Sequence, residues 1–145
     1  MKTAVENPTA SQIRYEYHHM GIPTAAIREN ERYSSTFRMY TSDAAGSNFH
    51  VQWHRFEQDS PLHPLIQSFP HVAFKVTSID QAIEGKKVLL GPYFPFEGFR
   101  VVMIEDGGIP VEFIETNLTE EEIWSGVKKP SWMYPEQGGT EERAA

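Results

Sequence analysis

The sequence contains no cysteine among its 145 residues. This absence excludes a disulfide scaffold, a thiolate metal site and a cysteine nucleophile together, so any metal ligands must be His, Asp, Glu or Gln. Basic residues are also few, because 13 Lys and Arg stand against 20 Asp and Glu and leave a net charge of -7. Such a chain attracts neither a phosphate backbone nor an anionic lipid surface, and we expect no nucleic-acid or membrane partner.

Long hydrophobic runs are missing too. No stretch approaches the length of a membrane span, and the polar N-terminal segment lacks the apolar core of a signal peptide, so we expect a cytoplasmic protein. Glycine-rich phosphate loops, serine nucleophile motifs and basic aromatic patches are absent from the sequence as well. A chain of this length typically folds as one domain, and we predict a single domain over residues 1–145.

The hydrophobic pattern of the first half predicts short strands. Alternation over 15–22 is typical of a strand in which His18 and His19 face opposite sides. After it we expect a weak helix at 25–35 and then the two strands of a hairpin, at 37–41 and 49–56. A proline-containing connector follows at 59–70, where long regular structure is excluded.

The same order of elements returns in the second half. The pattern predicts a strand opening at His71, a short helix capped by Ser78, and strands at 88–90, 99–105 and 111–115. Between these strands, the aromatic segment 92–98 is expected to be a loop that either closes over a substrate or covers the sheet. Thr119 and Glu122 form a capping box for a last helix, and the chain from 129 onward is expected to be a loosely held tail.

The two halves align with each other as an internal duplication. Four-residue and shorter matches recur at offsets of 52, 62 and 60, and they pair His19–Ile22 with His71–Phe74, Phe37–Arg38 with Phe99–Arg100, and Val51–Trp53 with Val111–Phe113. A chance match between two β-rich halves is the alternative. If the duplication is real, His19 and His71 occupy matching positions, which indicates a shared divalent-metal site.

Glu112 is the natural completion of this site. It lies between Val111 and Phe113 in a strand expected to be buried, where an unpaired carboxylate costs several kcal/mol, so it needs a cation. Besides a metal, Arg38 or Arg100 can supply that cation, or the strand can be an edge at which Glu112 is wet. Glu115 points the other way by alternation and is expected to be solvated.

The sequence resembles the vicinal oxygen chelate superfamily, which contains glyoxalases, bleomycin-resistance proteins and extradiol dioxygenases. The resemblance is carried by HHMGI at 18–22, PHVAFKV at 70–76 and GGIPVEFIE at 107–115. It implies an α+β, glyoxalase-like fold of two tandem βαβββ modules that form a cupped mixed sheet, with module one at about 14–58, module two at about 69–116, and a C-terminal helix and tail at 117–145. It also implies a homodimer.

The resemblance further implies a ligand set taken from the first and last strands of each module. The matching positions here are His19, Gln52, His71 and Glu112. This set is similar to that of methylmalonyl-CoA epimerase-like members, whereas extradiol dioxygenases use only the three positions without Gln52. Nitrogen and oxygen ligands without thiolate suit Zn, Ni, Co, Mn or Fe(II).

Two of these ligand positions have rivals in the sequence. His18 competes with His19 if the register is shifted by one, although parity with the strand at His71 favours His19. His50 competes with Gln52 if the hairpins are aligned by their glycines. His54 lies on the same strand face as Gln52 and is a candidate proton shuttle beside Glu112, because its ordinary pKa is near neutral.

Three functions are consistent with such a site. The first is an enzyme that enolises a small carbonyl or carboxylate compound, as a lyase, isomerase or epimerase, with Glu112 and His54 as the catalytic residues. The second is an Fe(II) extradiol-type dioxygenase. The third is a small-molecule binding protein of the bleomycin-resistance type, which needs no metal.

Overall fold

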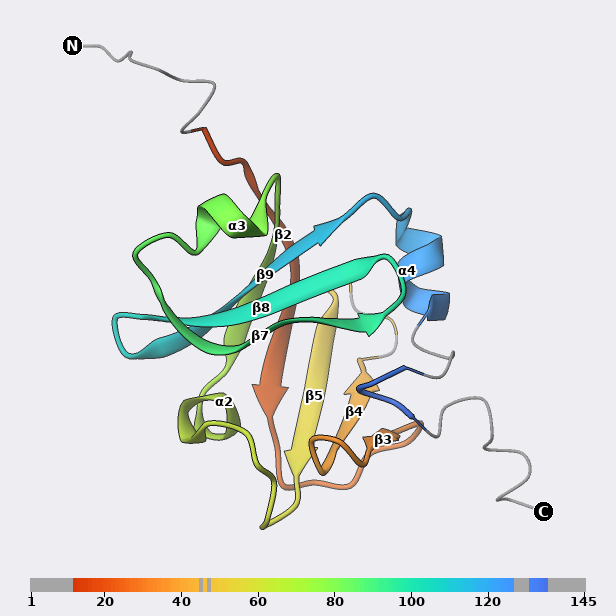
Figure 1. The fold of residues 1–145 in the computed structure, drawn as a ribbon. Helices are drawn as coiled ribbons and strands as arrows, with labels where there is room; N and C mark the ends of the chain where they lie inside the picture. Colours follow the sequence, from red (N-terminus) through yellow and green to blue (C-terminus); the bar gives the residue numbers. More distant parts are fainter. Residues whose placement is uncertain (1–11, 45, 47, 127–130, 136–145) are drawn as a thin grey trace.

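A computed structural model describes residues 12–44, 46, 48–126 and 131–135 (Figure 1). Its helices are short: α2 (Pro64–Ser68), α3 (Ile79–Ala82) and α4 (Glu120–Gly126). Its strands are β2 (Tyr15–Pro23), β3 (Arg32–Ser34), β4 (Met39–Asp43), β5 (Val51–Phe56), β6 (His71–Val76), β7 (Lys87–Phe96), β8 (Phe99–Asp106) and β9 (Ile109–Thr116). None of the helices in these ranges is long and apolar enough to cross a membrane.

All eight strands form one mixed sheet in the order β3-β4-β5-β2-β6-β9-β8-β7. The first strands of the two halves, β2 and β6, are antiparallel neighbours at its centre, and each pairs in parallel with the last strand of its own half, β5 or β9. In Figure 1, β7 and β8 cross in front of β2 and β5 at a steep angle, so the sheet is strongly curled. This arrangement confirms the predicted cupped sheet of two tandem modules.

The strand register agrees with the duplication at its centre and corrects it in the hairpins. Gly21 pairs with Gln52 in the first half and Ala73 with Glu112 in the second, as offsets of 52 and 60 require. The pairs Thr41–His54 and Val101–Ile114 also correspond, at an offset of 60 for both strands. The alignment of Phe37 with Phe99 was therefore wrong by two residues, because weakly similar strands slide against each other in a sequence comparison without penalty.

The weak helix predicted at 25–35 is absent. Residues 24–31 are irregular, with a bend at 25–26 and a turn at 29–30, and β3 occupies 32–34. Ile27, an apolar residue that such a helix would have to bury, is 79% exposed. A short helix without an apolar face to pack is not stable, so module one contains the four strands without the helix.

The aromatic segment 92–98 was predicted as a loop but belongs largely to a strand. β7 runs continuously to Phe96, with register shifts against β8 on either side of Tyr93. Prolines are tolerated here because β7 is the edge strand of the sheet. Phe96 is 4% exposed and stacks on Phe99 at a centroid distance of 4.7 Å, so the segment forms a wall of the interior and not a loop that closes.

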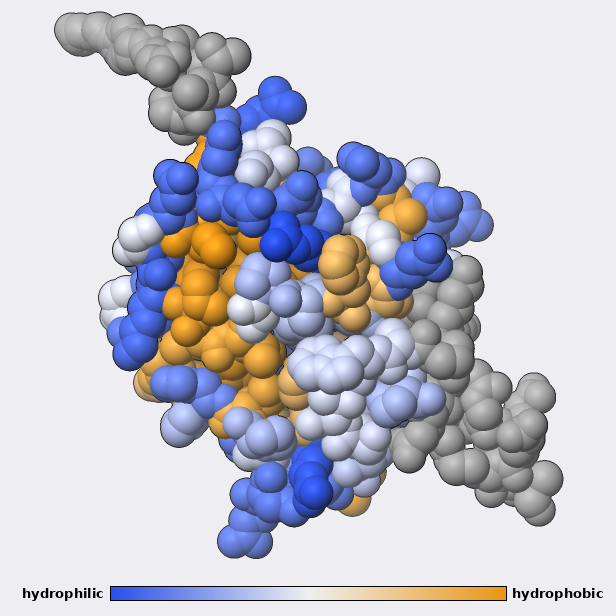
Figure 2. Space-filling view, viewed as in Figure 1, coloured by the Kyte–Doolittle hydropathy of each residue, from blue (hydrophilic) through white to orange (hydrophobic). Residues whose placement is uncertain are grey.

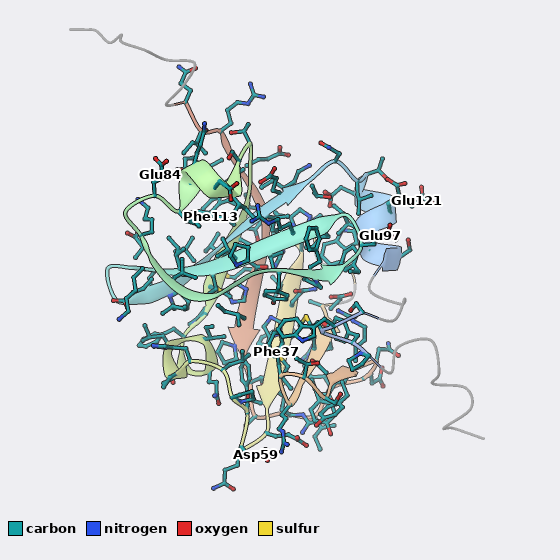
Figure 3. All side chains as sticks on the ribbon, in the orientation of Figure 1. Phe37, Asp59, Glu84, Glu97, Phe113 and Glu121 are labelled. Carbon is teal, nitrogen blue, oxygen red and sulfur yellow. The ribbon has the colours of Figure 1, made fainter. Side chains whose placement is uncertain are left out.

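The C-terminal segment closes the concave side of the sheet. The capping box is confirmed, since Glu122 N donates to Thr119 Oγ1 at 3.1 Å and Thr119 N donates to Glu122 Oε1 at 2.8 Å. Beyond α4, the predicted loose tail lies outside the described residues except at 131–135, where the prediction is wrong. There Met133 and Tyr134 are buried in a cluster with Phe37. Figure 3 shows Phe37 near the centre of the molecule, in contrast to the surface residue Asp59 at its edge.

Replacing Tyr134 with alanine is expected to destabilise the protein by about 3 kcal/mol, because a buried aromatic ring leaves a cavity when it is removed. Trp132→Ala is the matched control, since Trp132 is 55% exposed and its loss should cost about 1 kcal/mol or less. Urea unfolding of both variants measures the difference. Equal and small losses would show that this segment is not part of the core.

Candidate metal centre

Three ligand-type side chains from three central strands meet at one point. His71 Nε2 lies 3.0 Å from Glu112 Oε1, and His19 Nε2 lies 3.3 Å from the same oxygen. One ligand atom of each residue lies within 4.8 Å of the others, and both histidines are buried. With metal–ligand bonds of about 2.1 Å, neighbouring ligand atoms lie on the order of 3 Å apart, so the cluster has the spacing that a bound ion requires.

The sheet register explains why these residues converge. Directly paired residues of neighbouring strands point to the same side, and Glu112 is paired with Ala73, which is paired with His19. The next row contains Gln52, Gly21 and His71 in the same way. The two rows correspond through the duplication, and each places a small residue between two ligand-type residues. The predicted positions therefore lie side by side around the centre of the sheet.

The electrostatics of Glu112 are those of a carboxylate with cationic or hydrogen-bonding partners. Burial raises the pKa of its carboxyl, but the hydrogen bonds and charges of His19 and His71 outweigh burial and hold that pKa well below its usual range. Arg38 and Arg100, the alternative partners, are engaged elsewhere: Arg38 contacts Asp59, and Arg100 contacts Asp80. The two histidines, and not an arginine, are the partners of Glu112.

Gln52 lies in the matching row and lines the same cavity as the three residues. Its Nε2 donates to Asp43 Oδ1 at 2.9 Å, which leaves the amide oxygen, the atom able to bind a metal, without that contact. Asp43 is the cross-strand partner of Gln52 in β4 and so orients its amide. Gln52 as a fourth ligand stays a prediction.

His50 occupies a different place. It corresponds to Pro110 and not to Glu112, so the register does not support an alignment of the hairpins by their glycines. Its side chain is exposed, and its Nδ1 lies 3.1 Å from the backbone oxygen of His18, to which it donates. Among the described residues, His50 is not part of the cluster of ligand atoms.

His18 and His19 both face the cavity, contrary to the predicted alternation. The pairing of β2 with β6 shifts between Tyr17 and His19, so His18 is the extra residue of a β-bulge. A bulge is invisible to a period-two pattern because it inserts one residue without changing the side-chain types. His18 Nδ1 lies 2.9 Å from His19 Nδ1, and its ring stacks on Trp124 at 5.6 Å.

This contact would let His18 orient His19 as a metal ligand. If Nε2 of His19 bound an ion, its proton would stay on Nδ1, which would then donate to His18 Nδ1. His18 Nε2 is buried without a well-aligned hydrogen bond, and Glu120 Oε2 of α4 lies 3.2 Å from it. Burial, ahead of the charge of His19, lowers the pKa of His18, which favours the neutral ring that can accept this proton.

Replacing His18 with phenylalanine is expected to weaken metal binding about 10-fold to 100-fold, because the ring stacking is kept while the partner of His19 Nδ1 is lost. Titration calorimetry with Zn²⁺ measures the affinity, and nitrogen NMR of the histidines reports the tautomer of His19. Glu121→Gln, an exposed change on the same helix, serves as the control. An affinity of the phenylalanine variant within twofold of the wild type would contradict the role of His18.

His54, the predicted proton shuttle, lies one row away from Gln52. Its Nδ1 is 3.0 Å from Thr41 Oγ1, and its ring stacks on His71 at 5.6 Å. Its Nε2 is buried and has no hydrogen-bond partner among the described residues. Burial, followed by the neighbouring rings of His71 and His19, lowers the pKa of His54 well below its usual range, so this ring is neutral with one nitrogen free.

Sequence reasoning missed several residues of the site. Gly21 stands against the rings of His71 and His54, and Asp43, Thr41 and Trp124 each contact a predicted site residue. Gly21 was detectable, because it follows His19 by two residues and aligns with Ala73, which follows His71 by two residues. The contact with Trp124 was not, since nothing in the local sequence places α4 over β2.

The site opens on a cavity inside the curled sheet. Apart from the cluster, its walls are mostly apolar, with side chains from β4, β7, β8, α4 and the segment 131–135. Phe37, Met39, Met103 and Tyr134 are representative. A small organic molecule fits this kind of enclosure, which combines an apolar body with a few convergent polar groups.

The comparisons with known proteins agree on the fold. No family model matches the chain, and no curated protein matches it. Among solved structures, methylmalonyl-CoA epimerase from Mycobacterium tuberculosis is similar at 16% identity, with a TM-score of 0.51 over 71% of this chain and 89% of that one. A hypothetical protein from Bacillus halodurans C-125 is similar at 16% identity, with a TM-score of 0.54 over 74% and 96%. The chain therefore shares the fold of these two structures, which is the glyoxalase-like cupped sheet that its sequence motifs predicted.

Proposed function

We propose that this protein is a divalent-metal-dependent enzyme that transfers a proton next to a carbonyl group of a small molecule. The observation that carries the proposal is the convergence of His19, His71 and Glu112 on one point. This point lies beside a cavity that a further histidine, His54, also lines. Lyase, isomerase and epimerase reactions all begin with such a transfer. Epimerisation, for which one structural neighbour is named, is the simplest of them.

The three residues would hold the ion, with Gln52 as a weaker and neutral fourth ligand. A bound divalent ion would polarise a substrate carbonyl and favour the negative charge that develops when the neighbouring carbon loses its proton. Zn, Ni, Co, Mn and Fe(II) all suit this donor set. The neutral amide of Gln52 adds no negative charge, so the site stays attractive to an anionic substrate.

His54 is the residue best placed to take up the proton. Its neutral ring is held by Thr41, and its Nε2 has no competing partner in the described part of the chain. Its stacking against His71 keeps that nitrogen beside the cluster. A ligand carboxylate that leaves the metal, Glu112, is the alternative base.

Metal analysis tests the proposal directly. Protein purified without added metal or chelator is expected to contain about one Zn, Ni, Co or Mn per chain, and His71→Ala is expected to contain none. The metal-loaded protein should also accelerate hydrogen–deuterium exchange next to the carbonyl of 2-oxobutyrate in D₂O, followed by proton NMR. If the wild type never retains metal and the exchange is no faster than in buffer, the proposal is wrong and a binding protein of the bleomycin-resistance type is left.

An Fe(II) extradiol-type dioxygenase is the second candidate, because the cluster of three needs no contribution from Gln52. In that case iron should be retained, and a catechol should be consumed together with oxygen. Retention of Zn, with no oxygen uptake, would remove this candidate.

The homodimer expected from the resemblance is also a proposal. Figure 2 shows apolar surface gathered over one half of β7 and β8. Val88 of the edge strand β7 is 40% exposed. Apolar surface along an unpaired edge favours association. Light scattering after size-exclusion chromatography measures the mass. A strictly monomeric protein at about 100 micromolar, on the order of 100 000 times a nanomolar dissociation constant, would contradict the dimer.

A further inference from the structure

One charged side chain in the cavity takes no part in the metal cluster. Arg32 of β3 is cross-strand partner to Thr41 of β4, which is partner to His54 of β5. These three residues form a row that points to the same side of the sheet as the row of Gln52. Arg32 lines the cavity, and its side chain is only 14% exposed.

The guanidinium of Arg32 has fewer partners than its burial requires. Its Nη1 lies 3.3 Å from Asp43 Oδ2, and its Nε is buried without a hydrogen-bond partner. The ring of Tyr134 lies 6.0 Å from the guanidinium carbon. A guanidinium carries five N–H donors, and one long contact to a carboxylate that is itself 44% exposed and shared with Gln52 does not satisfy them.

The surroundings make this charge distinctive. Among the described residues that line the cavity, Arg32 is the one Arg or Lys, and apart from Thr41, Gln52, Glu112 and the histidines the remaining wall is apolar or aromatic. A buried cation with spare donors in an apolar enclosure selects a ligand that brings an anion to it. The planar guanidinium is matched best by a carboxylate.

We infer that the substrate is an amphipathic carboxylic acid, whose carboxylate binds Arg32 while its carbonyl end lies at the metal cluster and its carbon chain crosses the apolar wall. The inference rests on the proposed function for the carbonyl end only. The backbone positions of Arg32 and of Gln52, the expected fourth ligand, are two strands and two residues apart, which is on the order of 10 Å across and 7 Å along the sheet. His71 of the cluster lies two strands further in the row of Gln52, so the two groups of the substrate are separated by several carbon atoms.

Hydroxamate probes test the inference, because a hydroxamate chelates a divalent ion through two neighbouring oxygens. The monohydroxamates of succinic, glutaric and adipic acid carry a terminal carboxylate, and the matched alkyl hydroxamates carry a methyl group in its place. In the Zn-loaded protein, the carboxylate member of at least one pair is expected to bind about tenfold more tightly than its methyl counterpart. Without an anchoring cation the preference would have the opposite sign, since an unpaired carboxylate is costly in an apolar cavity.

Variants assign the preference to Arg32. Arg32→Met should abolish or reverse it, and Arg32→Lys should keep part of it. Arg38→Met should leave it unchanged, because Arg38 is exposed and contacts Asp59 outside the cavity. Circular dichroism and Zn affinity confirm that each variant is folded with its metal site intact. The inference is overturned if wild type prefers the methyl member of every pair, or if Arg32→Met keeps the preference for the carboxylate.

A second pair of probes separates this inference from the proposed function. Hexanoate and hexanamide are compared by calorimetry on the metal-free protein, in which Arg32 is still present. If no metal ever binds, but hexanoate is preferred and Arg32→Met removes the preference, the proposed function fails and the inference stands. If metal binds and neither pair favours the anion, the inference fails alone.

Discussion

Glu112→Gln is expected to lower the affinity for Zn²⁺ by at least about 100-fold and to abolish deuterium exchange into the oxo-acid probe. Loss of a residue that supports a metal ligand already lowers metal affinity about 10-fold to 100-fold. Glu112 carries the oxygen, Oε1, on which the Nε2 atoms of His19 and His71 converge. Glutamine keeps the size of the side chain but removes its charge, so the effect does not come from packing. Titration calorimetry gives the affinity, and NMR gives the exchange rate.

Glu115→Gln is the matched control, because Glu115 lies three residues along β9 from Glu112 and therefore on the opposite face. Its Oε1 accepts a hydrogen bond from Ile79 N at 2.8 Å, and an amide oxygen can accept the same bond. Chelation with EDTA should lower the melting temperature of the wild type and of this control, since a ligand that binds only the folded state stabilises it, and should leave Glu112→Gln unchanged. Equal responses of all three proteins to EDTA would place the metal elsewhere.

Gly21→Ala is expected to disrupt the site nearly as strongly, although it replaces none of the proposed ligands. A Cβ atom at Gly21 would lie 2.2 Å from His71 Cε1 and 2.7 Å from His54 Nε2, which is too close for either ring to stay in place. We expect the affinity for Zn²⁺ to fall by about 100-fold as His71 is displaced, with a loss of about 1–3 kcal/mol in the free energy of unfolding from overpacking. Calorimetry and urea unfolding measure the two quantities.

Ala73→Gly is the control for Gly21→Ala, because Ala73 occupies the corresponding position of the second half and is fully buried. Losing its methyl group should cost about 1 kcal/mol of stability and leave the three ligands where they are. The two variants then have similar stability and different metal affinity. A wild-type affinity in Gly21→Ala would mean that the rings have room to move, and that the site tolerates it.

Much of the candidate site could be predicted because its residues repeat. His19 and His71 lie in equivalent strands at matching positions of the duplication, and Glu112 follows an apolar residue in a strand whose burial is visible in its composition. Glu115 was correctly placed on the opposite face, because residues at odd spacing alternate sides in a regular strand. Local spacing carries this information without any knowledge of the tertiary contacts.

Prediction failed where a backbone departs from its regular period or where packing decides. The bulge at His18 turned both neighbouring histidines to the cavity, and the edge position of β7 let Tyr93 and Pro95 lie in a strand. Met133 and Tyr134 are buried in the cluster with Phe37, although they lie in a Pro-, Gly- and Glu-rich end of the chain. The run of Trp, Met and Tyr at 132–134 could have indicated this burial, whereas the bulge and the edge position have no signature in the nearby residues.

The sequence by itself determined the kinds of atoms that can bind a metal here, the duplication, and the two histidines and one carboxylate that meet at its centre. Those properties depend on residue type and on the spacing along a strand. The tertiary structure alone decided that Asp43 orients Gln52, that His18 supports His19, and that Arg32 faces the same cavity as the ligands. The first two contacts depend on the pairing of β4 with β5 and on the β-bulge at His18, and the third depends on the curl of the whole sheet, so none of them follows from residue type and regular spacing alone.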